Sequence, residues 1–332
     1  MTADEEMELD SLEGVGPVTK QKLHEAGIYS IMDLAARGVG EVADSINGDT
    51  AKASELINKA RTKLSDLGVL AKDFVSAREL FQKRQSIERV STGSKNLDTL
   101  LGGGVETGAV TEFYGEFGSG KSQICHTLAV MVQESKEKGG LSAGALYVDT
   151  EGTFRPERIA EIAEARGTDP GKVLDNIIVA KAYNSAHQEL IVREVGRQIE
   201  RTKLKLVVVD SAVAHYRAEF LGRGTLAERQ QRLNRFMHML VRDAEVYGVV
   251  VVVTNQVQSS PDFFFGDPTR ATGGHVVAHT STYRLYLRKA SKSRIARMVD
   301  SPYHPEGEAV FVINSKGVDD PSEDSPRKRS GS

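Results

Sequence analysis

The fold is decided by the stretch Val110-Thr-Glu-Phe-Tyr-Gly-Glu-Phe-Gly-Ser-Gly-Lys-Ser122 and the helical pattern that follows it. Residues 110–114 have the length and composition of a buried strand. Residues 115–122 have the spacing G-x-x-x-x-G-K-S of a phosphate-binding loop between a strand and a helix. In such a loop the glycines allow backbone N–H groups to surround phosphate oxygens, and the helix N-terminus adds partial positive charge. The stretch therefore predicts a nucleotide-binding unit.

Two side chains of this loop have predicted roles in binding ATP and Mg²⁺. Lys121 is expected to reach the β- and γ-phosphates, and the Ser122 hydroxyl is expected to bind Mg²⁺. A chance glycine-rich turn is the alternative, but it would not need a strand before it and a helix after it. The nucleotide-binding residues predicted here are Gly115, Glu116, Phe117, Gly118, Ser119, Gly120, Lys121, Ser122 and Gln123.

Short apolar runs alternate with amphipathic helical patterns through the rest of the chain from about residue 91. Nearly uninterrupted β-branched runs are typical of strands buried on both faces of a parallel sheet. The alternating order predicts an α/β fold with a mainly parallel, doubly wound sheet. The expected strands are residues 110–114, 145–148, 177–180, 206–209 and 249–253, followed by 283–287, 295–299 and 310–313.

Polar side chains end three of these expected strands, at the edge where ligands bind in open α/β sheets. Asp210 is predicted to organise the metal ion; an aspartate that only caps a turn is the alternative. Glu151 is our predicted general base for the attacking water, and Asp149 competes for that role. Gln256 is predicted to contact the γ-phosphate, unless it only caps a loop.

A helical segment after Glu151 carries two arginines, Arg155 and Arg158. Either guanidinium could stack on an adenine ring, and we assign Arg158 to the nucleotide site. A solvated helix face is the alternative for both residues.

The length of 332 residues fits one or two folded units, and 39% hydrophobic with 27% charged residues is typical of a globular protein. We expect an all-α unit over residues 1–70, a linker over 71–90, the α/β core over 91–318 and a disordered tail over 319–332. In the first unit, Leu12-Glu-Gly-Val-Gly-Pro17 has the helix-hairpin-helix pattern, whose backbone N–H groups can face a DNA phosphate. The acidic charge of this unit leaves a role in protein interaction equally open.

Other features of the sequence exclude whole classes of protein. The only cysteine, Cys125, rules out an intrachain disulfide. The first ten residues are acidic, unlike a secretory signal, and the longest apolar run, residues 249–253, is far too short to span a bilayer. We therefore expect a cytoplasmic, nucleoid-associated protein without membrane contact.

The net charge of −3 restricts any nucleic-acid binding to locally basic segments. Segment 217–235 is rich in arginine, segment 258–275 combines phenylalanines with a glycine pair, and the basic run 284–297 contains no acidic residue. Guanidinium groups bind phosphates and aromatic rings stack on bases. For the first two segments a charged helix face and a packed aromatic loop are the alternatives, and for the basic run a solvated hairpin is. The predicted DNA-binding residues are Arg217, Arg223, Arg229, Phe263, Phe264, Arg270, Gly273 and Gly274.

Together, the phosphate loop, the Asp210 strand, the two DNA segments and the helix-hairpin-helix pattern resemble the archaeal RadA recombinases, within the RecA-type ATPases. The resemblance covers residues 8–318, and its specificity comes from the order and spacing of the set. It implies a RecA-type P-loop ATPase core. It also implies a self-assembling protein that forms a head-to-tail filament or a ring on single-stranded and double-stranded DNA.

The resemblance implies further site residues. Phe74 and Ala77 match a polymerisation motif F-x-x-A that inserts into the next protomer, although a linker phenylalanine packed on its own domain is the simpler interpretation. Residues 300–307, including Pro302 and Glu306, resemble a cap over the neighbour's ATP, with Glu306 a candidate for binding K⁺. His279 would link the second DNA segment to the nucleotide; otherwise it is a core histidine.

These expectations converge on a DNA-dependent ATPase that exchanges DNA strands in homologous recombination and repair. One alternative is a non-catalytic paralogue that loads a recombinase as a mediator. Another is a ring-forming, DNA-dependent RecA-type motor. If the chain is the recombinase, mediators are among its expected partners.

Overall fold

The computed structural model describes residues 7–69, 74–259, 269–271 and 275–322. Contacts within the chain define two compact units. The smaller comprises Met1–Ile87 with Arg193–Gln198, and the larger comprises Glu88–Val192 with Ile199–Ser332.

The smaller unit is helical in its described residues. Its core is a cluster of buried aliphatic side chains that includes Leu23, Leu34 and Leu56. Gly16 precedes the first α-helix, and Pro17 occupies that helix's first turn, where a missing N–H costs nothing. The elements are the 3₁₀ helix η1 (Leu9–Ser11) and the α-helices α2 (Pro17–Glu25), α3 (Ile31–Ala36), α4 (Val39–Ser45), α5 (Thr50–Asp66) and α6 (Ala77–Gln85).

The larger unit is built on a ten-stranded sheet with the order β12-β11-β10-β9-β3-β7-β6-β4-β5, and β8 pairs with β7. Six adjacent strands, from β5 to β9, run parallel, which confirms the predicted α/β class with a mainly parallel sheet. The strands are β3 (Ala109–Gly115), β4 (Gly144–Asp149), β5 (Ile177–Lys181), β6 (Leu204–Asp210), β7 (Val250–Ser259), β8 (Thr269–Ala271), β9 (Tyr283–Ala290), β10 (Ser293–Asp300), β11 (Gly307–Asn314) and β12 (Gly317–Asp319).

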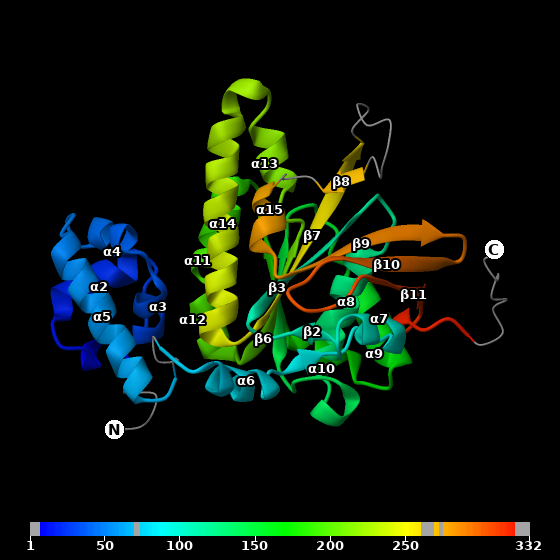
Figure 1. The fold of residues 1–332 in the computed structure, drawn as a ribbon, viewed down its shortest axis with the longest axis horizontal. Coiled ribbons are helices and arrows are strands. Elements are labelled where there is room, and N and C mark those ends of the chain that lie inside the picture. The colour runs from blue at the N-terminus through cyan, green and yellow to red at the C-terminus, as the bar shows by residue number, and fades with distance from the viewer. Residues whose placement is uncertain (1–6, 70–73, 260–268, 272–274, 323–332) are drawn as a thin grey trace. The chain divides into compact units, whose positions relative to one another are not determined.

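Helices cover both faces of this sheet. In Figure 1, α8 and α9 lie on one side of the sheet, and α14 and α15 lie on the other. Every residue of β3 is buried, because successive side chains point to opposite faces and both faces are packed. The helices are α7 (Lys95–Leu100), α8 (Lys121–Met131), α9 (Pro156–Ala165), α10 (Pro170–Asp175), α11 (Ser185–Arg193), α12 (Val195–Thr202), α13 (Ala214–Glu219), α14 (Leu226–Tyr247) and α15 (His275–Thr280), with the short 3₁₀ helices η2 (Lys136–Lys138) and η3 (Arg223–Thr225).

A two-stranded antiparallel hairpin precedes this sheet. Its strands are β1 (Arg89–Val90) and β2 (Val105–Glu106), and helix α7 lies between them in the chain. The hairpin therefore connects the end of the linker to the core.

The last described residues are bound to the core. Asp319 belongs to β12, and the Asp320 carboxylate accepts hydrogen bonds from Ser94 Oγ and the backbone N–H groups of Lys95 and Asn96 at the start of α7. The ordered core thus continues past residue 318, where we expected the tail to begin. Residues 323–332 of that tail lie outside the described part of the chain. Among the described helices, none combines the length and apolar character that a membrane crossing requires.

Candidate nucleotide site and nucleic-acid interface

The phosphate loop connects β3 to α8. Gly120 directly precedes α8 with φ of 109°, a left-handed conformation that side chains with a Cβ rarely adopt. Ser119 is buried, and its hydroxyl has no hydrogen-bond partner within the described structure. Glu116 and Phe117 are exposed, whereas Ser122 and Gln123 are half-buried in the first turn of α8. The backbone at the start of α8 has the form that binds phosphate.

Lys121 is the first residue of α8 and folds back over the loop. Its Nζ donates hydrogen bonds to the carbonyl oxygens of Gly115 and Glu116, at 2.8 and 2.9 Å. Burial lowers the pKa of the Lys121 ammonium, and the charges of Asp210 and Glu151 oppose that shift. The three charged groups therefore share one electrostatic environment at the edge of the sheet.

A second group of polar side chains at this edge comes from three neighbouring strands and the residues that follow them. Glu151 Oε1 accepts hydrogen bonds from Ser211 Oγ at 2.8 Å and from Gln256 Nε2 at 3.1 Å. Glu151 follows β4, Ser211 follows β6, and Gln256 lies in β7. The Glu151 carboxylate is exposed on its remaining side, so it can accept a proton from a water molecule. Sequence reasoning did not single out Ser211, although it directly follows Asp210.

Asp149 is engaged in a different way. Its side-chain oxygens accept hydrogen bonds from the backbone N–H groups of Glu151, Thr153 and Phe154, at 3.0 to 3.2 Å. The residue is buried, and all three bonds lie within the turn that follows β4. Asp149 therefore shapes the loop that presents Glu151.

Asp210 ends β6 and is only 3% exposed. Its Oδ2 accepts from the Tyr147 hydroxyl at 2.8 Å and from Thr153 Oγ1 at 3.3 Å, and its Oδ1 accepts from Thr254 Oγ1. Three hydroxyl groups thus fix the orientation of this carboxylate. The sequence patterns did not identify the hydroxyl donors, because each comes from a different segment.

The residues present fit Mg²⁺ bound together with a nucleotide. Among the described residues, no group of three or more His, Cys, Asp or Glu side chains could hold a metal by itself. Mg²⁺ prefers one or two protein oxygens together with substrate phosphates. A hydroxyl at position 122, beside the phosphate loop, and an oriented carboxylate at position 210 have this chemistry.

Arg158 contacts the start of α8. Its Nε donates to Gln123 Oε1 at 2.8 Å, its Nη1 pairs with Glu161 at 2.7 Å, and its Nη2 donates to the Asn314 carbonyl at 2.5 Å. Arg155 instead donates to the carbonyl oxygens of Gly152 and Phe154 within its own turn. Of the two arginines, Arg158 is therefore the one that contacts a predicted nucleotide-binding residue.

The first predicted DNA segment runs from α13 through η3 into α14. Arg217 lies in α13, Arg223 begins η3, and Arg229 lies in the first turns of α14. Arg232, a further arginine of the segment, is paired with Glu189, and its guanidinium lies 5.3 Å from the Phe220 ring centre. Arg232 therefore holds elements of the core together.

The second segment begins as a hairpin, because β7 continues to Ser259 and pairs with β8. Arg270 lies in β8, opposite Gln258. Phe263, Phe264, Gly273 and Gly274 lie outside the described residues. His279 is exposed near the end of α15, so it is not the core histidine of the alternative interpretation.

One member of the basic run is not available to DNA. The Arg284 Nε donates to Glu112 Oε2 at 2.6 Å, and Asn255 Nδ2 donates to Glu112 Oε1 at 2.9 Å. Glu112 and Asn255 are completely buried. The side chains of Arg284, Glu112 and Asn255 thus link β9, β3 and β7 within the sheet. The sequence left the basic run open between a solvated hairpin and a DNA-binding surface; at Arg284 the charge instead compensates a buried carboxylate.

The linker residues have few contacts of their own. Phe74 is 94% exposed, and no residue of α6, which begins at Ala77, is buried. Ser76 and Glu79 form a capping box, so the helix is stabilised locally. The structure does not pack Phe74 on its own unit, which was the simpler interpretation of the sequence.

Pro302 and Glu306 lie in the loop between β10 and β11 and are both exposed. The Glu306 carboxylate lies 3.7 Å from Arg297 Nη2, and its side chain is 85% exposed. This loop is the predicted cap.

Comparison with known proteins agrees with this geometry. The Rad51 family model matches residues 83–321, which include the phosphate loop, Glu151, Asp210 and Gln256. Over 320 residues the chain is 52% identical to the DNA repair and recombination protein RadA of Cenarchaeum symbiosum (strain A). That alignment covers 96% of this chain and 80% of the relative. These matches confirm the resemblance drawn from the motifs, and the chain belongs to the Rad51 family of RecA-type recombinases.

Proposed function

We propose that the cluster at the strand edge is the ATPase centre of a DNA strand-exchange recombinase. As a member of its family, the chain is a DNA-dependent ATPase that acts in DNA recombination and repair with ATP and Mg²⁺. The observation that supports the assignment of the centre is the Glu151 carboxylate, held by Ser211 and Gln256 close to Lys121. The roles below belong to the same proposal.

Each residue of the centre has a distinct role. Lys121 would leave the carbonyl oxygens that it contacts and bind the β- and γ-phosphates. Ser122 and Asp210 would hold Mg²⁺, which when bound supplies positive charge beside the phosphate oxygens. Glu151 would accept the proton of the attacking water. Arg158 would support the nucleotide-binding surface through Gln123.

Gln256 would couple the nucleotide to DNA. It lies in β7, the strand that continues into the second DNA segment, and its amide already contacts Glu151. A change at the γ-phosphate would alter this amide and therefore the segment beyond it, with His279 as a second link. Arg217, Arg223, Arg229 and Arg270, together with Phe263, Phe264, Gly273 and Gly274, are the proposed DNA-binding residues.

Assembly would use the exposed linker. Phe74 and Ala77 would insert into the core of the next protomer, because Phe74 has no cover of its own. A suitable receiving face is β5, the edge strand of the sheet, where Val179 is exposed. Such a head-to-tail contact does not close on itself and so builds an open filament.

Other parts of the proposal concern the cap and the smaller unit. Glu306 would hold K⁺ near the neighbour's ATP, since its carboxylate is exposed and only loosely paired with Arg297. The N-terminal unit, residues 1–70, would be a helix-hairpin-helix domain, joined to the core by the linker 71–90. Mediator proteins would load the recombinase on DNA.

The deciding experiment measures ATP hydrolysis with and without single-stranded DNA, over a range of KCl concentrations and with NaCl as the control salt. We expect DNA to stimulate turnover and K⁺ to support it better than Na⁺. Strand exchange between homologous DNA molecules is the next test. Turnover that is indifferent to DNA would contradict the coupling through Gln256.

A further inference from the structure

The cap loop between β10 and β11 has a defined internal structure. Ser301 Oγ accepts hydrogen bonds from the backbone N–H groups of Tyr303 and His304, and it lies 2.9 Å from His304 Nδ1. The rings of Tyr303 and His304 are stacked at a tilt, with centroids 4.0 Å apart. The two aromatic side chains therefore form one rigid unit within the loop.

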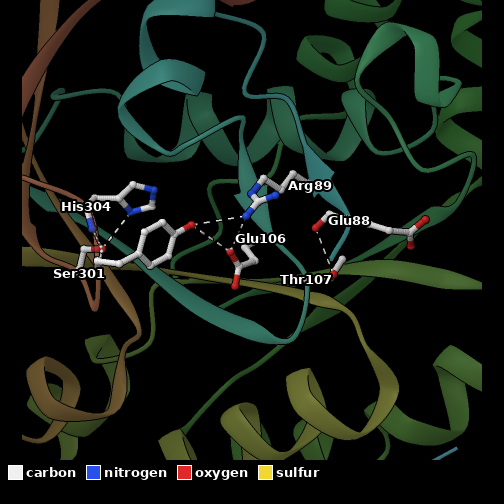
Figure 2. Close-up of polar contacts among 7 residues, drawn as sticks. Glu88, Arg89, Glu106, Thr107, Ser301 and His304 are labelled. Carbon is white, nitrogen blue, oxygen red and sulfur yellow. Dashed lines mark hydrogen bonds and ion pairs between the residues drawn. The ribbon is translucent and has the colours of Figure 1, made fainter. Parts of the chain in front are cut away.

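This unit meets the β1–β2 hairpin through Tyr303, and Figure 2 shows Ser301 and His304 of the loop with Arg89 and Glu106 of the hairpin. The Tyr303 hydroxyl lies 3.4 Å from Arg89 Nη2 and 3.5 Å from Glu106 Oε2, and the Arg89 and Glu106 groups pair with each other at 3.0 Å. Glu106 is 4% exposed, so its charge depends on these partners. The Tyr283 ring adds an apolar wall 5.5 Å from the His304 ring.

The glycine cluster 102–104 has a steric role in the same place. A Cβ at position 102 would lie 2.5 Å from His304 Nε2, so a larger residue would displace that ring from its present place. A Cβ at position 104 would collide with the carbonyl oxygen of Val90 in β1. The glycines thus let the turn approach both the cap loop and the hairpin.

The pairing of β1 with β2 is extended by the residues that flank the two strands. The Glu88 carbonyl accepts hydrogen bonds from Thr107 N and Thr107 Oγ1, at 3.0 and 3.1 Å (Figure 2). Directly before it in the chain stands the linker that carries Phe74 and Ala77. The linker therefore leads directly into the hairpin that the cap loop contacts.

We propose that Arg89, Glu106 and the turn 102–104 form a seat for Tyr303 and His304. The seat holds the cap loop where it closes over the ATP of the neighbouring protomer. Tyr303 and His304 are positioning residues, since they act through the placement of the loop. This inference rests on the proposed function, in which ATP is bound between protomers.

The test measures DNA-stimulated ATP hydrolysis by the full chain carrying Tyr303→Ala, Tyr303→Phe or His304→Ala. We expect Tyr303→Ala to raise the KM for ATP about tenfold, a loss of about 1.4 kcal/mol in binding, while kcat changes less than twofold. Tyr303→Phe keeps the stacked ring and loses only the hydroxyl, so its KM should rise less. Val310→Ala, an exposed side chain on β11, is the matched control and should leave KM unchanged.

A second measurement separates positioning from a general structural effect. In assembly-deficient Phe74→Ala protein, Tyr303→Ala should not change the affinity for a fluorescent ATP analogue, because the seat serves the neighbour. An equal loss of affinity in this background would overturn the seat, as would an unchanged KM in the assembled Tyr303→Ala protein. If Tyr303→Ala does not fold, Tyr303→Phe and His304→Ala provide the same comparison. Wild-type protein without DNA-stimulated turnover would instead overturn the proposed function, and the seat with it.

Discussion

At the residue scale, Asp149 and Glu151 show how position along a turn separates two carboxylates. Both are acidic, and both stand at the end of the same strand. The Asp149 side chain is buried and accepts three backbone hydrogen bonds, whereas Glu151 is exposed and contacts only side chains. The Asp149 oxygens are occupied by N–H donors of the turn, so they are not directed toward an attacking water. The geometry therefore favours Glu151 for proton transfer.

The substitutions Glu151→Gln and Asp149→Asn should have different consequences. Glu151→Gln keeps the shape of the side chain and removes its basicity, so kcat should fall by about 10²- to 10⁴-fold while ATP still binds. Asp149→Asn weakens the bonds that shape the turn, so it should lower the melting temperature as well as activity. Single-turnover hydrolysis and thermal unfolding measure the two effects. A Glu151→Gln protein with wild-type kcat would exclude Glu151 as the base.

At the element scale, helix α8 carries a buried histidine beneath the catalytic edge. His126 is packed against the rings of Tyr147 and Phe154, with centroids 5.5 and 5.6 Å away. Its Nε2 accepts a hydrogen bond from Arg155 N, which requires a neutral ring with its proton on Nδ1. Burial lowers the pKa of His126 to about 4. The helix therefore packs well only when this ring is uncharged.

This histidine should make folding sensitive to pH. The folded pKa is below the unfolded value, so the unfolded state binds more protons between about pH 6.5 and pH 4, and stability falls as the pH falls through this window. From pH 7.5 to 5.5, His126 should lower the free energy of unfolding by about 1.3 kcal/mol. Urea unfolding at the two pH values measures this change. His126→Asn should reduce it, whereas His238→Asn, at an exposed position on α14, should not.

Helix α6 is stabilised by its capping box and not by burial. Phe74→Ala should therefore leave the melting temperature within about 2 °C of wild type, since a fully exposed side chain contributes little to folding. The same change should reduce the mass of assemblies, because burial of one phenylalanine at an interface contributes about 1.5–3 kcal/mol. Light scattering measures the mass. Val18→Ala, which also truncates an exposed apolar side chain, should leave it unchanged.

At the scale of the whole molecule, the net charge of −3 restricts the proposed DNA binding to local concentrations of arginine. Arg223→Ala should weaken binding to single-stranded DNA and reduce the salt slope by about 0.7 if it removes one phosphate contact. Arg242→Ala is the control, because Arg242 lies beside Asp243 near the C-terminal end of α14. Fluorescence anisotropy at several salt concentrations measures both slopes. An unaltered slope for Arg223→Ala would place the DNA contact elsewhere.

The mode of assembly also belongs to this scale. A head-to-tail contact through Phe74 predicts open filaments on DNA, whereas a RecA-type motor would form closed rings. Electron microscopy with ATP and single-stranded DNA distinguishes the two.

The sequence by itself determined the class of fold and predicted most of the residues of the proposed nucleotide site. Buried parallel strands need continuous apolar runs, and a phosphate loop needs glycines and lysine at fixed spacing, so both leave local patterns. Each expected strand was found, and β7 exceeded its expected length because its polar end pairs with β8. Glu151, Asp210 and Gln256 could be identified because each follows an apolar run.

Only the tertiary structure decided which partners these residues have. Ser211 beside Glu151, the hydroxyls around Asp210 and the Glu112–Arg284 pair join segments that lie tens of residues apart, and no local pattern records such pairings. Arg284 illustrates the reason, since in the sequence it belongs to a basic run, whereas in the fold its partner is the buried Glu112 carboxylate. The seat of the cap loop likewise joins residues 89–106 to residues 301–304. The spacing of residues along the chain predicts local chemistry, but long-range contacts form only when the strands take their order in the sheet.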